Sequence, residues 1–182
     1  MVLGIAFLSG CQTPGERKVS YPTVIARSGD SQGFPRQAAG FSRGNTVSYE
    51  PGMKNTSVGY NFFTPSAQQA VTFYFYPKSQ PFAQQIDSEK KMIEQVQEEA
   101  TVLNETEQAI NRGKRTFQSH TVNYQIKGII LGKKQVLYSQ LLLIELPERY
   151  VKVRSTSPLA QADKANRRLL DLLEQIDWTK TP

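Results

Sequence analysis

The chain has 182 residues, of which 38% are hydrophobic, and it carries a formal net charge of +6. This length fits one domain with an additional tail, since domains commonly contain about 100–150 residues. A single cysteine excludes an intramolecular disulfide framework, and lysines and arginines spread along the chain argue against a nucleic-acid partner.

The first ten residues, 1–10, are apolar and uncharged, but a transmembrane helix needs about 20 such residues. They end in Leu8-Ser9-Gly10-Cys11, which resembles the bacterial lipobox. The resemblance implies a signal peptide at 1–10, cleavage between Gly10 and Cys11, and lipid on the Cys11 thiol. It also implies a bacterial envelope protein. Gln12 after the cysteine indicates an outer-membrane lipoprotein facing the periplasm, rather than an inner-membrane one.

The leader departs from a signal peptide in one respect, because no Lys or Arg precedes Arg17. We therefore expect the true translation start to lie upstream; the alternative is a hydrophobic N-terminus in which Cys11 occurs by chance. Residues 11–37 mix proline and glycine with polar residues, which predicts a flexible tether after the lipidated cysteine. An ordered arm lying along the domain is the alternative. The folded domain is expected to span 38–182.

Three strands and a helix are expected in the first half of this domain. The strands should lie at 41–49, 56–63 and 70–76, since apolar and polar residues alternate there and turn residues separate them. A helix should begin at Ser79 or Pro81 and continue to Thr106. Its apolar stripe, which we expect to face the core rather than a partner, comprises Phe82, Ile86, Ile93, Val96, Ala100 and Leu103.

The second half repeats this layout, after a basic loop at 111–115. Strands are expected at 116–130, 135–146 and 149–157, followed by a helix from about 159 to 176. The continuous apolar run Leu141–Ile144 predicts a strand that is covered on both faces. Trp178 is expected to cap the core after the last helix, with an exposed aromatic as the alternative.

The resulting βββα-βββα order predicts an α+β fold in which helices pack on the faces of an antiparallel sheet. This order resembles the PsbP-like sandwich, through Val71–Pro77, the helix after it, Tyr150–Arg154 and the C-terminal helix that ends at Asp177-Trp178. That fold occurs in extrinsic photosystem proteins, in a nuclear-transport factor that binds the GTPase Ran, and in bacterial proteins of unassigned function. It implies a fold over 41–178 but no site residues.

Motifs for catalysis, metals and cofactors are absent from the sequence. His120 is the only histidine, no cluster has metal-ligand spacing, and neither a Gly-x-Ser-x-Gly elbow nor a Walker loop occurs. We therefore expect no catalytic residue, no metal and no cofactor. An enzyme whose site is assembled from residues distant in sequence stays open as an alternative.

Two sets of residues could form a binding surface. A basic patch for lipid headgroups or an acidic partner would arise if Arg112, Lys114 and Arg115 converged with Lys152 and Arg154. The alternative is ordinary solubilising charge. Six tyrosines fall on expected strands and predict either core packing or a tyrosine-lined groove: Tyr60, Tyr74, Tyr76, Tyr124, Tyr138 and Tyr150.

These observations predict a lipid-anchored envelope protein that serves as a non-catalytic binding or assembly module. The membrane would be contacted through the lipid on Cys11, and an envelope protein would be the partner. The alternatives are an envelope enzyme and a soluble small-ligand-binding protein.

Overall fold

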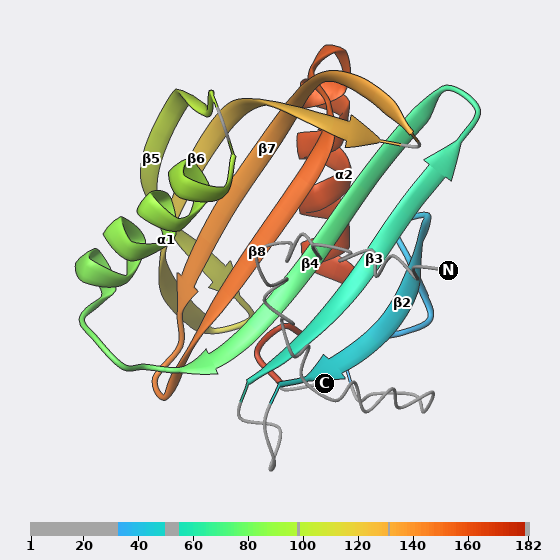
Figure 1. Cartoon of the computed structure of the whole chain (residues 1–182). Coiled ribbons are helices and arrows are strands. Elements are labelled where there is room, and N and C mark those ends of the chain that lie inside the picture. Colours follow the sequence, from blue (N-terminus) through green and yellow to red (C-terminus); the bar gives the residue numbers. More distant parts are fainter. Residues whose placement is uncertain (1–32, 50–54, 98, 131, 181–182) are drawn as a thin grey trace, which may run out of the picture.

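Alternating apolar and polar residues produce one antiparallel sheet of eight strands in the computed structural model, which describes residues 33–49, 55–97, 99–130 and 132–180 (Figure 1). Two four-stranded meanders meet at the β4–β8 pair, since the strand order is β1-β2-β3-β4-β8-β7-β6-β5. The first half comprises β1 (Gln37–Ala38), β2 (Phe41–Ser48), β3 (Thr56–Thr64), β4 (Ala67–Pro77) and α1 (Phe82–Val96). The second comprises β5 (Thr101–Arg112), β6 (Arg115–Ile130), β7 (Lys133–Glu145), β8 (Arg149–Pro158), a short 3-10 helix (Leu159–Gln161) and α2 (Ala162–Gln175).

The predicted PsbP-like sandwich with βββα-βββα order is wrong. The described residues form a single eight-stranded sheet with only two α-helices, and each helix follows four strands rather than three. The six strands predicted from alternation are present, with ends within about three residues of those expected. The two strands that the sequence did not reveal are the short β1 and the long β5 at the sheet edges.

The largest error concerns the residues after Val96, which were expected to continue α1 to Thr106. The helix ends at Val96, Glu99 adopts a φ of 62°, and residues 101–112 form β5. A positive φ at a non-glycine residue cannot continue a right-handed helix. Val96 and Leu103 are 70% and 45% exposed and lie outside the core, whereas Ala100 between them is partly buried against the cluster around Ile93.

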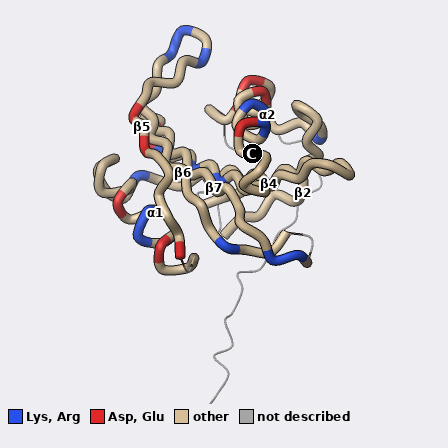
Figure 2. Tube along the Cα trace, turned by 90° about the horizontal axis from the view of Figure 1, so that it is seen from above, with Lys and Arg blue, Asp and Glu red and all other residues tan. Residues whose placement is uncertain are grey.

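Helix α1 lies over β6, β7 and β8 on one face of the sheet (Figure 1). Ile93 packs with β6 and β7 residues, whereas Phe82 and Ile86 pack with Leu143 and Tyr150. The helix does not extend over β2, β3 and much of β4 on this face, which we call the α1 face (Figure 1). Helix α2 lies on the opposite face, as the edge-on view of Figure 2 shows.

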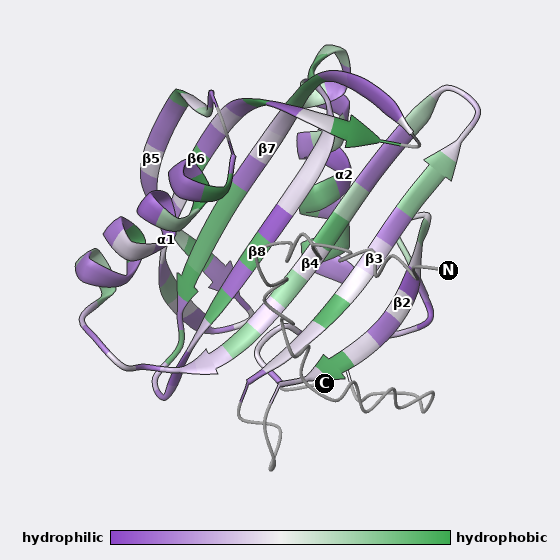
Figure 3. Cartoon of the chain, in the orientation of Figure 1, coloured by the Kyte–Doolittle hydropathy of each residue, from purple (hydrophilic) through white to green (hydrophobic). Residues whose placement is uncertain are grey.

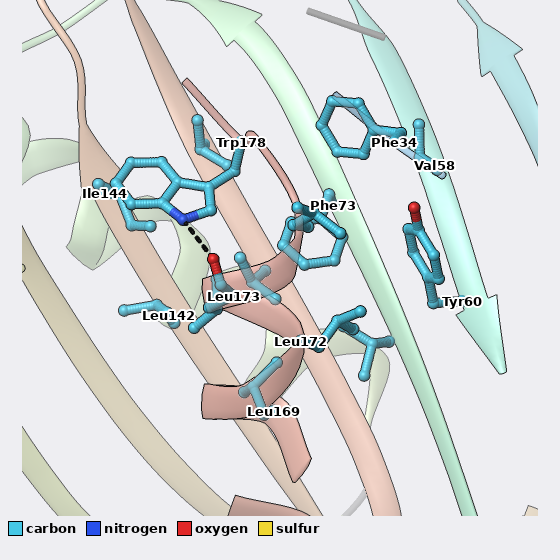
Figure 4. Packing of buried hydrophobic residues seen from close by; sticks show 14 of the residues in the cluster. Phe34, Val58, Tyr60, Phe73, Leu142, Ile144, Leu169, Leu172, Leu173 and Trp178 are labelled. Atoms are coloured by element: carbon cyan, nitrogen blue, oxygen red, sulfur yellow. Dashed lines mark hydrogen bonds between the residues drawn. The ribbon is translucent and has the colours of Figure 1, made fainter. Parts of the chain in front are cut away.

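The main core lies between the sheet and α2 (Figure 4). Leu169, Leu172 and Leu173 of α2 pack there against the β4 and β8 residues that face away from α1. Trp178 caps this core as predicted: it is 1% exposed, and its Nε1 donates a hydrogen bond to the carbonyl oxygen of Leu173 at 3.1 Å. Its ring contacts Phe117 edge-on, with centroids 5.4 Å apart.

Strand β7 is covered on both faces, which confirms the prediction from its apolar run. Leu141 and Leu143 belong to the clusters under α1, whereas Leu142 and Ile144 belong to the cluster under α2. Figure 3 shows the corresponding contrast: β7 carries a long hydrophobic stretch, whereas hydrophobic and hydrophilic residues alternate along β3 and β4. A strand buried on both faces needs such a run because both sets of alternate side chains lose contact with water.

The folded part of the chain begins no later than Gly33. Phe34 is fully buried and contacts Phe73 and Phe75 edge-on, and the Gly33 carbonyl accepts a 2.8 Å hydrogen bond from the backbone of Asp177. Residues 33–37, which fall within the predicted tether, therefore pack against the domain. The rest of the tether and the leader lie outside the described residues.

Candidate functional site

A hollow opens on the α1 face at the junction of the two meanders. Strand β4 contributes Thr72, Tyr74 and Tyr76, and β8 contributes Lys152 and Arg154. The register aligns Tyr74 with Lys152 and Thr72 with Arg154, while the alternate residues enter the core under α2. The two-residue period of a strand thus places an entire polar row on the α1 face.

The hollow has two parts that share Tyr74, Glu89 and Lys152. One part, of about 540 Å³, extends toward β2 and the start of α1, where Tyr49, Tyr76 and Gln85 line it. The other, of about 430 Å³, extends along the second half of α1. Its walls are Met92, Ile93 and Val96 on the helix and Arg154 on the strand. The first part is therefore polar and aromatic, and the second combines an apolar wall with a basic one.

Glu89 is the centre of the polar network between the two parts. Its carboxylate accepts hydrogen bonds from Tyr76 Oη at 2.8 Å and Gln85 Nε2 at 3.0 Å, and its Oε2 lies 2.9 Å from Lys152 Nζ. Burial and the adjacent carboxylate raise the pKa of Tyr76, so its hydroxyl stays protonated and donates to Glu89. Every partner that such a buried carboxylate needs is present.

Lys152 is fixed by the tyrosines as well as by Glu89. Its ammonium lies 4.7 Å from the ring centroid of Tyr74 and 5.8 Å from that of Tyr76. Both distances lie within the range of a cation–π interaction. The charge of Lys152 is therefore balanced inside the protein and is not available to a ligand as a free cation.

Arg154 is in a different position. Its Nη2 donates to the hydroxyl oxygen of Ser139 at 2.8 Å, a neutral acceptor, and its Nε has no hydrogen-bond partner among the described residues. Burial lowers the pKa of the Arg154 guanidinium, which nevertheless remains charged at neutral pH. None of the ion pairs found among the described residues includes it. A positive charge at the wall of the hollow is thus unpaired.

The sequence contains one signal for this site. Glu89 falls on the buried stripe of α1, between Ile86 and Ile93, at the spacing of a core position. A carboxylate on an apolar stripe must find a partner, because burying a charge alone is costly. The partner, Lys152, lies 63 residues further along the chain and only the fold reveals it.

The predicted basic patch is not assembled. Only Lys152 and Arg154 lie together, on one face of β8. Arg112 instead donates hydrogen bonds to the carbonyl oxygens of Leu173, Glu174 and Ile176 at the end of α2. Lys114 and Arg115 are exposed at the tip of the β5–β6 hairpin, which extends away from the sheet (Figure 2).

The tyrosines divide between the two predicted roles. Tyr60, Tyr124, Tyr138 and Tyr150 are buried, as core packing requires, whereas Tyr74 and Tyr76 line the hollow. Burial raises the pKa of Tyr124 to about 12. Tyrosines thus contribute both to the core and to one wall of the hollow.

His120 belongs to a separate polar cluster between β5, β6 and α1. Its Nε2 lies 2.6 Å from Glu105 Oε1, and Lys90 Nζ lies 2.6 Å from Glu105 Oε2. The hydrogen bond from Lys90, followed by the one from His120, holds the pKa of Glu105 below its ordinary value despite partial burial. The cluster thus ties the edge strand β5 to α1.

Neither cluster has the composition of a metal centre, since the described part of the chain contains no group of three or more His, Cys, Asp or Glu side chains suited to hold one. Gly10 and Cys11, the predicted cleavage and lipidation positions, lie outside the described residues. Within the described ranges, no helix is both long and apolar enough to cross a bilayer.

No protein-family model and no curated protein matches the chain. Among solved structures it is similar to the crystal structure of a protein of unknown function, PA94, from Pseudomonas aeruginosa. The two chains are 10% identical, with a TM-score of 0.55 over 74% of this chain and 90% of that one. At this identity the similarity shows the fold alone.

Proposed function

We propose that the protein is a non-catalytic binding module of the bacterial cell envelope, held at the outer membrane by lipid on Cys11 and facing the periplasm. The motif Leu8-Ser9-Gly10-Cys11 supports the anchor. The single structural observation that supports binding is the hollow on the α1 face, with Tyr74, Glu89 and Lys152 at its centre. An anchored domain with such a hollow can hold a ligand or a segment of an envelope protein close to the membrane.

The polar groups of the hollow favour binding over catalysis. Catalysis needs a group that is free to exchange a proton or attack a substrate. Glu89 instead holds three partners, and the Tyr76 hydroxyl is bound in the same network. A static network of this kind orients the walls of a pocket.

A second candidate is a soluble small-ligand-binding protein. The volumes of the two parts, about 540 and 430 Å³, are in the range of small-molecule sites. This candidate shares the hollow with the first and differs in lacking the lipid on Cys11.

Membrane fractionation distinguishes the two. The gene would be expressed with its upstream codons, as wild type and as Cys11→Ala, in bacteria labelled with radioactive palmitate. We expect label and outer-membrane sedimentation for the wild type, and unlabelled protein away from the outer membrane for Cys11→Ala. If both proteins are unlabelled and sediment identically, the anchor is excluded and the soluble candidate replaces it.

A further inference from the structure

The charges around the hollow do not cancel. Glu89 contributes one negative charge and Lys152 and Arg154 contribute two positive charges, and the Glu89 carboxylate lies 2.9 Å from the Lys152 ammonium. Glu89 also attracts Arg154 electrostatically, but its ion pair is with Lys152, so Arg154 leaves the hollow with one positive charge in excess. Because water solvates a partly buried guanidinium poorly, an anion placed beside it is attracted more strongly than it would be at an exposed arginine.

An apolar wall stands opposite this charge. Met92 and Val96 are 52% and 70% exposed on consecutive turns of α1, and buried Ile93 lies between them. All three line the same part of the hollow as Arg154. Exposed methionine and valine side chains beside a cavity provide a surface from which a hydrocarbon chain can displace water.

We propose that the part of the hollow between α1 and β8 binds a small anionic amphiphile, with its carboxylate or phosphate head at Arg154 and its hydrocarbon chain against Met92, Ile93 and Val96. This inference deepens the proposed binding function and rests on it. The volume of about 430 Å³ admits a single hydrocarbon chain of moderate length rather than a folded protein partner. The anionic head of the ligand would contact β8 and its hydrocarbon chain would contact α1. The two contacts can therefore be tested separately.

Four probes test the two halves of the ligand: decanoate, decyl phosphate, decanol and inorganic phosphate. Binding to the full chain carrying Cys11→Ser, which bears no lipid, would be measured by isothermal titration calorimetry below the aggregation concentration of each probe. We expect both decyl anions to bind at least about tenfold more tightly than decanol or phosphate, since a charge-assisted pair contributes more than 1.4 kcal/mol. A free fatty acid and a phospholipid headgroup are distinguished by the ratio of decanoate to decyl phosphate.

Two variants and a matched control locate the site. Arg154→Gln should reduce decanoate affinity at least about tenfold, and Met92→Glu should do the same by placing a carboxylate at the lip. Leu170→Glu, at an exposed apolar position of α2 on the opposite face of the sheet, should leave the affinity for decanoate unchanged. Circular dichroism would verify that each variant is folded. If Arg154→Gln does not fold, Met92→Glu still tests the site.

Three outcomes would overturn the inference: equal affinity for decanol and decanoate, an equal loss in Leu170→Glu, or no binding of any probe. The membrane fractionation of Cys11→Ala is independent of all three. If the ligand test fails while palmitate labelling is retained, the proposal of amphiphile binding is wrong and the proposal of a lipid-anchored envelope protein is unaffected.

Discussion

The ammonium of Lys152 on β8 lies 2.9 Å from the carboxylate of Glu89 on α1, and the two side chains are 15% and 5% exposed. This pair joins the helix of the first half of the chain to the last strand of the second half. Both residues also line both parts of the hollow. The stability of the fold and the shape of the candidate site therefore depend on the same contact.

Glu89→Gln should lower the free energy of unfolding by about 2–3 kcal/mol, because it leaves the Lys152 ammonium unpaired in a buried position. The double variant Glu89→Gln/Lys152→Met should recover part of this loss, which urea unfolding would measure. As a control, Glu145→Gln removes the more exposed Lys78–Glu145 pair and should cost less than about 1 kcal/mol. Equal losses in Glu89→Gln and Glu145→Gln would contradict the buried role of Glu89.

Arg112→Ala should lower the free energy of unfolding by about 1–2 kcal/mol, because the guanidinium donates to three carbonyl groups at the negative end of the α2 dipole. Arg112→Lys should retain part of the effect, since a lysine keeps the charge but not the fork geometry. Arg115→Ala at the exposed hairpin tip is the control and should change stability by less than about 0.5 kcal/mol. Thermal unfolding of the three variants tests whether Arg112 acts as a helix cap or, like Arg115, as surface charge.

Trp178→Ala should destabilise the protein by about 3–5 kcal/mol, since a fully buried ring and its contact with Phe117 are lost. Phe63→Ala, which truncates an exposed aromatic, should stay within about 0.5 kcal/mol. Trp178 is the only tryptophan, so its emission reports on this core directly in the wild type. Emission at the wavelength of a solvent-exposed indole in the native protein would contradict the buried position.

The cluster around Glu105 should make stability depend on pH at the acidic end. The folded pKa of Glu105 lies below the ordinary value of 4.5, so folding favours the carboxylate. Its contribution is complete above that value and is lost as the pH falls through the folded pKa. Glu105→Gln should therefore be less stable than the wild type at pH 7, and this difference should shrink as the pH falls below about 4.5.

Urea unfolding between pH 7 and pH 3 would measure that difference. Glu148→Gln, at the exposed turn between β7 and β8, is the matched control and should follow the wild type at each pH. A constant difference between Glu105→Gln and the wild type over this range would show that the contacts with Lys90 and His120 do not depend on the charge of Glu105.

Local pattern predicted six of the strands and the positions of both helices, but neither the fold class nor most of the candidate site. Strand β3 follows from the two-residue period of its apolar residues, because each row of alternate side chains must be buried or exposed as a unit. Strand β7 follows from a continuous apolar run, because both of its faces are buried. Strand β5 does not follow from such a pattern, because Val96, Ala100 and Leu103 match helical spacing although Leu103 lies on an exposed edge strand. Apolar spacing alone cannot distinguish a helix from a helix that turns into a strand.

The sequence by itself determined the positions of six strands and the burial of β7 on both faces, that Trp178 closes the core, and that Cys11 lies in a lipobox-like motif. Only the tertiary structure decided that β4 and β8 join the two meanders and that Lys152 meets Glu89 while Arg154 is left unpaired. The physical reason is the range of the interactions. Burial patterns repeat within a few residues, whereas a charge finds its partner across the 63 residues that separate Glu89 from Lys152.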